Sequence, residues 1–515
     1  MHTRIFYSVK KYILITALVF TVPSPVEAKL LKIIHTNDLH SHFESSDNPQ
    51  KGGYAALKAV INSIREDAKK NGIETLTMDA GDLSEGSPFF MAKEGQASFK
   101  VLDEIGYDAF TMGNHDWLIG TRQLNLLFEI VNPSAPILSA NIIFPKKYEA
   151  LKKLIRPYIE VKRAESRIAI LGLTTDEMIY SWRLNSGAKM LSALKTANLL
   201  IPRIRKNNDF VFALTHLGFK PDMELAKKTS GIDLIIGGHS HTTIFDPVLV
   251  QNKHGKNVPI MQTGEHGQYV GNLLLNIEPG KPIEIIHYEL VPVYADGPKD
   301  TTMTETVQDA RHALETKYGQ NWLYEMVAFS EVPIERPLYR STQWGNLVAD
   351  ALREAVKADA AIDVGEFYGT PQPPGPVTRE HIMKFYPRTF SLKKPFGWTV
   401  WTIQVPGWVL KLAIEEAERF GSPFTTSNIT YEIDPGTRTS FTNFRIGGEV
   451  INDLREYTIA VTEGIGRGAK EIFSPILKII FKPYNSNLPV WFAIENKLKQ
   501  IGGVVREPTS SSMPH

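Results

Sequence analysis

The sequence predicts an α/β protein with two domains, and two observations lead to that class. The chain has 515 residues, which is more than a single hydrophobic core usually organises. In its first half, short apolar runs alternate with segments of helical periodicity, the pattern of an α/β layer architecture. The formal net charge is +1, so no surplus of positive charge is available for a nucleic-acid backbone, and we expect no nucleic-acid polymer as a partner.

The N-terminal segment has the pattern of a cleavable export signal. A basic start precedes the apolar run Tyr12–Val22, which is too short to cross a bilayer comfortably. Val26 and Ala28 have the small size that a signal peptidase requires, so we expect a signal peptide over 1–28 and a mature chain from Lys29. The chain has 0 cysteines, which excludes a lipid-modified cleavage site and disulfides. We expect a soluble, monomeric protein without a membrane anchor, periplasmic or secreted.

The elements of the first domain follow from hydrophobic periodicity. Buried strands are predicted at Leu30–Thr36, Ile73–Asp79, Ala109–Met112, Ile168–Leu173, Phe210–Thr215 and Leu234–Ile236. Helices are predicted at Ala55–Lys70, Thr121–Ile130 and Ala193–Lys206. From Ile260 to Tyr288 one strand follows another, as in the closing half of a mixed sheet.

The second half of the chain predicts a linker and a separate domain. We expect a first domain over 29–300, a linker over 301–330 with a helix at Thr301–Tyr318, a second domain over 331–506 and a disordered tail over 507–515. Within the second domain we predict a helix at Asn346–Lys357, strands at Ile429–Ile433 and Tyr457–Val461, and a proline-rich loop at Thr370–Thr378.

Side chains that can bind metal ions follow five of the predicted strands. In strand order they are Asp38 and His40, Asp82, Asn114 with His115, His216, and His239 with His241. A single Asp-x-His pair is usually a surface loop, but five clusters at successive strand ends are a strong signal, because ligands of α/β sheets bind beyond the carboxyl ends of the strands. Carboxylate, imidazole and amide groups suit divalent Mn, Fe, Co, Ni or Zn.

These clusters resemble those of the calcineurin-like metallophosphoesterases, and within them the secreted bacterial 5′-nucleotidase and UDP-sugar hydrolase family. The resemblance is carried by His35–Phe43, Gly81-Asp82, Gly113–Asp116, Ser139–Asn141, Thr215-His216, Gly238–His241 and, more loosely, Arg340–Ala351. It implies a four-layer αββα metallophosphoesterase domain, joined by a helical linker to an α+β C-terminal substrate domain.

The resemblance also implies residue roles. One divalent ion would be held by Asp38, His40, Asp82 and His241, and a second by Asp82, Asn114, His216 and His239, with a metal-bridging hydroxide attacking the phosphorus atom in line. His115 would stabilise the transition state or protonate the leaving oxygen; its alternative is a structural role beside the ligands. Relatives often carry glutamine where this chain has His241, so the metal preference can differ.

Three departures from the family concern catalysis and the substrate. Relatives often place an aspartate three residues after the histidine, where this chain has Leu118. The segment 360–369 lacks the arginine that follows the family's Asn-Gly-Gly, and no aromatic residue stands near Gly464, where the second base-stacking ring is expected. The remaining candidates for substrate contacts are Phe424 as the first stacking ring, Arg379, Arg388 and Trp398.

The sequence therefore predicts a metal-dependent phosphoric ester hydrolase whose substrate is a small phosphate ester, with nucleotides favoured. The altered second domain leaves other substrates open for the same metal chemistry: a 2′,3′-cyclic nucleotide, a sugar nucleotide or a thiosulfonate. A metal-binding protein without catalysis is the alternative from another class, and the complete set of seven ligands argues against it.

Overall fold

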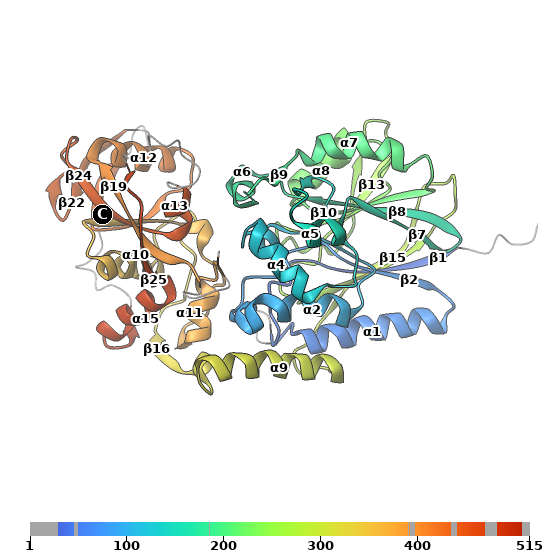
Figure 1. The fold of residues 1–515 in the computed structure, drawn as a ribbon, viewed down its shortest axis with the longest axis horizontal. Helices are drawn as coiled ribbons and strands as arrows, with labels where there is room; N and C mark the ends of the chain where they lie inside the picture. The colour runs from blue at the N-terminus through green and yellow to red at the C-terminus, as the bar shows by residue number, and fades with distance from the viewer. Residues whose placement is uncertain are drawn as a thin grey trace, which may run out of the picture.

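The computed structural model describes residues 29–45, 50–184, 186–389, 391, 397–433, 440–468 and 481–506. The expected signal peptide and C-terminal tail lie outside these residues. Two lobes lie side by side, and a long helix, α9 (Thr301–Tyr318), runs along the N-terminal lobe toward the C-terminal lobe (Figure 1). Within the described ranges, no helix combines the length and the apolar character that membrane crossing requires.

A seven-stranded sheet forms one central layer of the N-terminal lobe, in the order β15-β14-β1-β2-β3-β4-β6. Its strands are β1 (Leu30–Thr36), β2 (Glu74–Asp79), β3 (Ala109–Thr111), β4 (Ile137–Leu138), β6 (Ile155–Arg156), β14 (Tyr269–Asn276) and β15 (Glu284–Pro292). β1, β2 and β3 are parallel neighbours, so their carboxyl ends lie at one edge of the sheet.

A six-stranded sheet forms the other central layer, in the order β12-β13-β11-β10-β8-β7. Its strands are β7 (Tyr158–Arg163), β8 (Ser166–Thr174), β10 (Phe210–His216), β11 (Leu234–Ile236), β12 (Val248–Gln251) and β13 (Asn257–Met261), and a separate pair is formed by β5 (Ile142–Ile143) and β9 (Lys189–Met190). β8, β10 and β11 are parallel, so this sheet also gathers strand ends at one edge.

Helices cover the outer faces of both sheets. The helical segments of this lobe are α1 (Tyr54–Lys70), α2 (Gln96–Ile105), α3 (Asn114–Trp117), α4 (Thr121–Val131), α5 (Glu149–Leu154), α6 (Met178–Ser181), α7 (Ala193–Ile204) and α8 (Phe219–Lys228), with short 3₁₀ turns η1 (Pro88–Gly95) and η2 (Trp182–Leu184). The six strands and three helices predicted for this half are all present, with bounds shifted by at most a few residues.

Apolar side chains join the layers into a sandwich. Leu31 and Ile33 of β1 pack in one buried cluster with Phe210 and Phe212 of β10, between the two sheets. Ile34 points the other way and packs in the cluster that contains α1, as expected for a strand that is buried on both faces. A third cluster lies between the second sheet and α7 and α8. The predicted four-layer αββα arrangement is therefore confirmed.

The C-terminal lobe is built on a five-stranded sheet, β20-β17-β24-β19-β25, with two three-stranded sheets beside it, β18-β16-β26 and β21-β22-β23. The strands are β16 (Met326–Ser330), β17 (Ala360–Val364), β18 (Gly375–Thr378), β19 (Thr399–Pro406), β20 (Phe424–Ser427), β21 (Ile429–Ile433), β22 (Phe441–Ile446), β23 (Glu449–Val450), β24 (Glu456–Thr462), β25 (Tyr484–Pro489) and β26 (Val504–Val505). The helical segments are α10 (Gln343–Val356), α11 (Arg379–Phe385), α12 (Gly407–Arg419), α13 (Glu463–Arg467), α15 (Val490–Gln500), η3 (Trp322–Tyr324) and η4 (Gly365–Phe367).

Two details of this lobe differ from the predictions. β16 lies inside the expected linker, yet it pairs with β18 and β26 of the second domain. The prediction that Thr370–Thr378 is a loop is wrong for the second half of the segment, which forms β18. β18 is an edge strand of its sheet, and Pro376 is tolerated there because an edge strand has backbone positions that donate no ladder hydrogen bond.

Candidate active site

The turns that follow the parallel strands hold the predicted ligands in an unusual backbone conformation. Asp38, His40, Asp82, His239 and His241 have φ angles of 52°, 49°, 56°, 80° and 54°. Left-handed backbone is uncommon for residues with a side chain, and it persists where the surrounding structure enforces it, often at functional sites. The turns therefore direct these side chains to one place at the edge of both sheets.

One group of ligand atoms comes from the turns that follow β1 and β11. The Nε2 atom of His241 lies 3.3 Å from Oδ1 of Asp38, and Nε2 of His40 lies 3.8 Å from the same oxygen. Side-chain atoms of these three residues that could bind a metal lie within 4.8 Å of one another. The turns after the first and sixth predicted strands thus meet in space.

A second group lies next to the first, and its carboxylate, Asp82, is close to both groups. Asp82, His216 and His239 also have ligand atoms within 4.8 Å of one another, and Oδ2 of Asp82 lies 3.0 Å from Nε2 of His216. The same Asp82 oxygen lies 3.7 Å from Nε2 of His40. Asp82 therefore stands between the two groups, as a bridging ligand would.

Buried polar atoms without partners indicate where cations fit. Both amide atoms of Asn114 are buried and make no hydrogen bond among the described residues. Such atoms are costly unless something binds them. A Cβ atom on Gly113 would lie 2.1 Å from Oδ1 of Asp82, so only glycine allows this close approach. The donor set fits two divalent ions.

The electrostatics of the two groups favour the exchange of protons for metal ions. Burial acts to raise the pKa of Asp82, but the imidazoles of His216 and His115 outweigh burial and hold this pKa well below its usual range. Burial acts to lower the pKa of His216, and Asp82 outweighs it and raises this pKa to about 9. Metal ions bind the deprotonated imidazole, so metal binding would release these protons.

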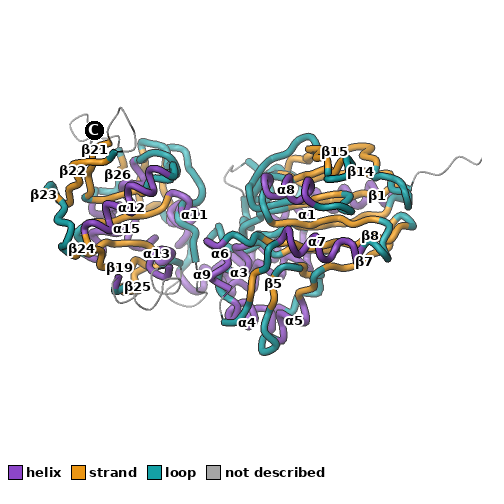
Figure 2. Tube along the Cα trace, turned by 90° about the horizontal axis from the view of Figure 1, so that it is seen from above, coloured by secondary structure: helices purple, strands orange, loops and turns teal. Residues whose placement is uncertain are grey.

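His115 lies on α3, at the side of the N-terminal lobe that faces the other lobe (Figure 2). Its Nδ1 atom pairs with the carboxylate of Glu85, and its Nε2 atom lies 3.1 Å from Nη1 of Arg388 and 3.9 Å from Asp82. The histidine therefore stands at the rim of the ligand groups, where a substrate phosphate would have to enter.

Asp116, the carboxylate next to His115 in the chain, has a different task. It accepts hydrogen bonds from the backbone N–H groups of Asp82, Leu83, Ser84 and Gly113. These bonds fix the turn that presents Asp82. Asp116 is thus committed to the backbone and is not a partner for the imidazole of His115.

Sequence reasoning missed two carboxylates that contact the predicted residues. Glu85 pairs with His115, and Glu265 pairs with Nδ1 of His241. A carboxylate on the second ring nitrogen fixes the tautomer and the orientation of a ligating histidine. The position of Glu85 in the same turn as Asp82 was a weak indication in the sequence that it lies near the site. Glu265 is distant from His241 in the sequence, and only the packing of the turn after β13 brings the two residues together.

A cavity of about 390 Å³ lies over the ligand groups, between the lobes. His115, His239 and His241 line it from the N-terminal lobe, and Arg336 and Arg388 line it from the C-terminal lobe. The guanidinium of Arg388 donates to the backbone carbonyls of Glu366 and Phe367. Two guanidinium groups opposite the ligand groups suit an anionic substrate.

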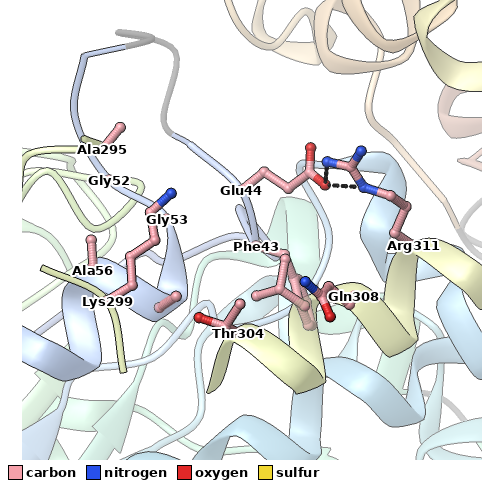
Figure 3. Close-up of a pocket in the computed structure, with 12 residues that line it drawn as sticks. Phe43, Glu44, Gly52, Gly53, Ala56, Ala295, Lys299, Thr304, Gln308 and Arg311 are labelled. Carbon is pink, nitrogen blue, oxygen red and sulfur yellow. Dashed lines mark hydrogen bonds and ion pairs between the residues drawn. The ribbon is translucent and has the colours of Figure 1, made fainter. Parts of the chain in front are cut away.

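Another cavity, of about 470 Å³, lies beside α9 and is lined by Phe43, Glu44 and Arg311 among others (Figure 3). No histidine occurs among the described residues that line it. Glu44 and Arg311 form an ion pair across it. Its chemistry does not suit metal-dependent hydrolysis, and we place the active site in the cavity between the lobes.

Arg379 and Phe424, two of the four predicted substrate contacts, do not reach this cavity. Arg379 forms ion pairs with Glu495 and Glu325, so its charge is neutralised within the C-terminal lobe. Phe424 begins β20 opposite Val364 and packs, half-buried, against the apolar cluster of the five-stranded sheet. Neither residue is among those that line the cavity; only Arg388 is brought to it.

The space near Gly464, where a second base-stacking ring was expected, is filled by other aromatic rings. A Cβ atom on Gly464 would lie 2.3 Å from the ring of Trp398 and 3.2 Å from that of Phe367. These two rings pack edge to face with centroids 4.8 Å apart. Trp398 is thus a buried packing residue, and the described residues leave no room for a ring on position 464.

The family comparisons divide the chain as the structure does. Residues 31–243 match the calcineurin-like phosphoesterases, and residues 326–478 match the 5′-nucleotidase C-terminal domain. The first range contains every predicted metal ligand, and the second contains Arg336 and Arg388.

Individual relatives are similar over part of their length. A 5′-nucleotidase of Vibrio parahaemolyticus is 28% identical over 382 residues, 64% of this chain and 66% of the relative. A trifunctional nucleotide phosphoesterase protein of Bacillus subtilis is 26% identical over 422 residues, 75% of this chain and 27% of the relative. The chain thus spans less than two thirds of either relative. The crystal structure of a 5′-nucleotidase precursor from Thermus thermophilus matches with a TM-score of 0.78 at 22% identity, covering 93% of this chain and 98% of that one, which establishes the shared fold.

Proposed function

We propose that this chain, which belongs to the calcineurin-like phosphoesterases and carries a 5′-nucleotidase C-terminal domain, is an exported two-metal hydrolase that releases phosphate from nucleotides. The observation that carries the proposal is the meeting of two groups of Asp and His ligand atoms, with Asp82 of the second group next to His40 of the first, beneath a cavity lined by arginines. The names of the relatives support the nucleotide as substrate. Export rests on the N-terminal sequence pattern alone.

The proposed division of labour assigns each side chain a task. Two divalent ions, when bound by Asp38, His40, Asp82, Asn114, His216, His239 and His241, would activate a water and neutralise charge on the phosphoryl oxygens. Arg388 would contact a phosphoryl oxygen from the opposite side of the cavity, since a guanidinium fork matches a phosphate. His115 would stabilise developing charge or protonate the leaving oxygen.

A second candidate keeps the reaction and changes the substrate. Trp398 and Phe367 occupy the space at Gly464, and Phe424 packs against its own sheet, so the pair of base-stacking rings expected from the family is not formed at these positions. This observation favours a substrate recognised mainly through its anionic groups, such as a cyclic nucleotide, a sugar nucleotide or a thiosulfonate.

A substrate screen tests both candidates. The purified protein would be assayed with nucleoside monophosphates, 2′,3′-cyclic nucleotides, a sugar nucleotide, a thiosulfonate and an aryl phosphate, each with Mn, Co, Zn or Mg. We expect phosphate release from nucleotides with at least one metal. Turnover of an alternative substrate but not of nucleotides would support the second candidate, and no turnover with any pair would contradict both.

A further inference from the structure

Glu85 is a buried carboxylate that contacts both lobes at the active site. The residue is only 1% exposed and follows Asp82 in the turn after β2. One of its oxygens pairs with Nδ1 of His115, and the other accepts a hydrogen bond from the backbone N–H of Thr389 in the C-terminal lobe. Both oxygens of this carboxylate are therefore used at the boundary between the lobes.

These contacts define the state of the His115 ring. A carboxylate accepts hydrogen bonds, so Nδ1 of His115 must carry the proton that it shares with Glu85. The other ring nitrogen, Nε2, faces a donor, Nη1 of Arg388, at 3.1 Å. Glu85 thus holds the imidazole with Nε2 directed to the cavity, which is the orientation that a group acting on the substrate requires.

No other described side chain offers His115 a comparable partner. Leu118, where relatives often have an aspartate, packs in the apolar core, and its carbonyl accepts from Arg183. Asp116 is occupied by backbone donors. The carboxylate that was missing from the sequence pattern therefore comes from a different turn.

Resting on the proposed function, we propose that Glu85 is the positioning residue of His115, and that the docked C-terminal lobe takes part through the N–H of Thr389. The imidazole would be aligned only while the segment that carries both Thr389 and Arg388 lies against the N-terminal lobe. Alignment of the histidine and delivery of the substrate-binding arginine are thereby linked to the same contact between lobes.

Glu85→Gln is a sharp test because the change conserves shape. Glutamine offers one acceptor and one donor group, whereas Glu85 accepts from two donors, so either His115 or Thr389 must face an NH₂ group. We expect kcat to fall about tenfold to a hundredfold, with a small change in KM and unchanged metal content.

The double variant Glu85→Gln with His115→Ala distinguishes a positioning role of Glu85 from a general disturbance of the structure. If Glu85 acts through His115, Glu85→Gln should cause no further loss of kcat in the His115→Ala background. Ring ¹⁵N NMR of the wild type should show His115 as the Nδ1–H tautomer, a signal that is absent from His115→Ala and altered in Glu85→Gln. This readout does not depend on the metal ions or on turnover.

Glu44→Gln is the matched control. Glu44 is also a carboxylate on an N-terminal loop that accepts from later residues, Arg311 (Figure 3) and Tyr324, but it lies outside the active site. The kcat of the Glu44→Gln variant should equal that of the wild type. Wild-type kcat in Glu85→Gln, an unchanged His115 tautomer, or equal losses with and without His115 would overturn the inference. An inactive wild type with the Nδ1–H tautomer intact would instead contradict the proposed function alone.

Discussion

The two walls of the active-site cavity are built in different ways. The N-terminal wall consists of turns that leave adjacent parallel strands, and contacts such as those of Asp116 with the backbone around Asp82 fix them within one domain. The C-terminal wall consists of connections that include Glu366–Pro371 and Pro387-Arg388, which reach the site because the second lobe is docked. We therefore expect metal binding to be set within one domain, and substrate contacts and the alignment of His115 to depend on the placement of two.

Asp82→Asn should have the largest effect, because this carboxylate stands between both ligand groups. A neutral amide weakens cation binding on both sides, so we expect phosphate release to fall by about a thousandfold or more and metal content to drop. Metal analysis by mass spectrometry and a phosphate assay would measure this. Full metal content with near wild-type turnover would contradict the two-metal interpretation of the N-terminal wall.

His115→Ala should lower kcat by about a hundredfold or more and leave metal content unchanged. The ring lies at the rim of the ligand groups on the N-terminal wall and contacts Arg388 of the C-terminal wall. If a metal ion is lost from this variant, His115 is itself a ligand, which its closeness to Asp82 and His40 would allow.

Arg388→Ala should lower kcat/KM by about tenfold to a hundredfold, since it removes the charged donor that the C-terminal wall presents. Arg379→Ala is the matched control, because Arg379 pairs with Glu495 and Glu325 away from the cavity. The control should lower the free energy of unfolding by about 1–3 kcal/mol and leave kcat/KM unchanged. Equal losses of kcat/KM in the two variants would contradict the proposal that Arg388 contacts the substrate and Arg379 does not.

Phe424→Ala should have the smallest kinetic effect. In the sequence this ring is the best candidate for stacking on a base, but in the structure it packs against the five-stranded sheet. We expect a stability loss of about 1–3 kcal/mol and an unchanged ratio of kcat/KM for a nucleotide to that for an aryl phosphate. A selective loss of about tenfold or more on the nucleotide would restore the stacking role.

Local pattern and strand order were enough to predict most of the first domain. The strand that ends at Thr36 and the strand Leu234–Ile236 have the predicted bounds, because apolar runs between polar turns leave little choice of register. Parallel strands place their carboxyl ends at one edge of each sheet, but Asp38 and His241 follow strands of different sheets, so their meeting also requires the two sheets to pack face to face. The edge strand β18 was missed because Pro376 and the prolines before the strand indicate a loop, and only the edge position of β18 in its sheet makes Pro376 acceptable.

The sequence by itself predicted the α/β class and the two-domain division, because these depend on periodicity and length, and the residue types of a metal site, because these depend on spacing within single turns; the αββα layering was implied by the family resemblance. Only the tertiary structure decided that Arg388 reaches the cavity while Arg379 is neutralised by Glu495. It also decided that Glu85 contacts His115 where Leu118 offers no carboxylate. Both outcomes depend on how separate turns and two lobes pack, and packing between segments distant in the chain leaves no regular spacing in the sequence.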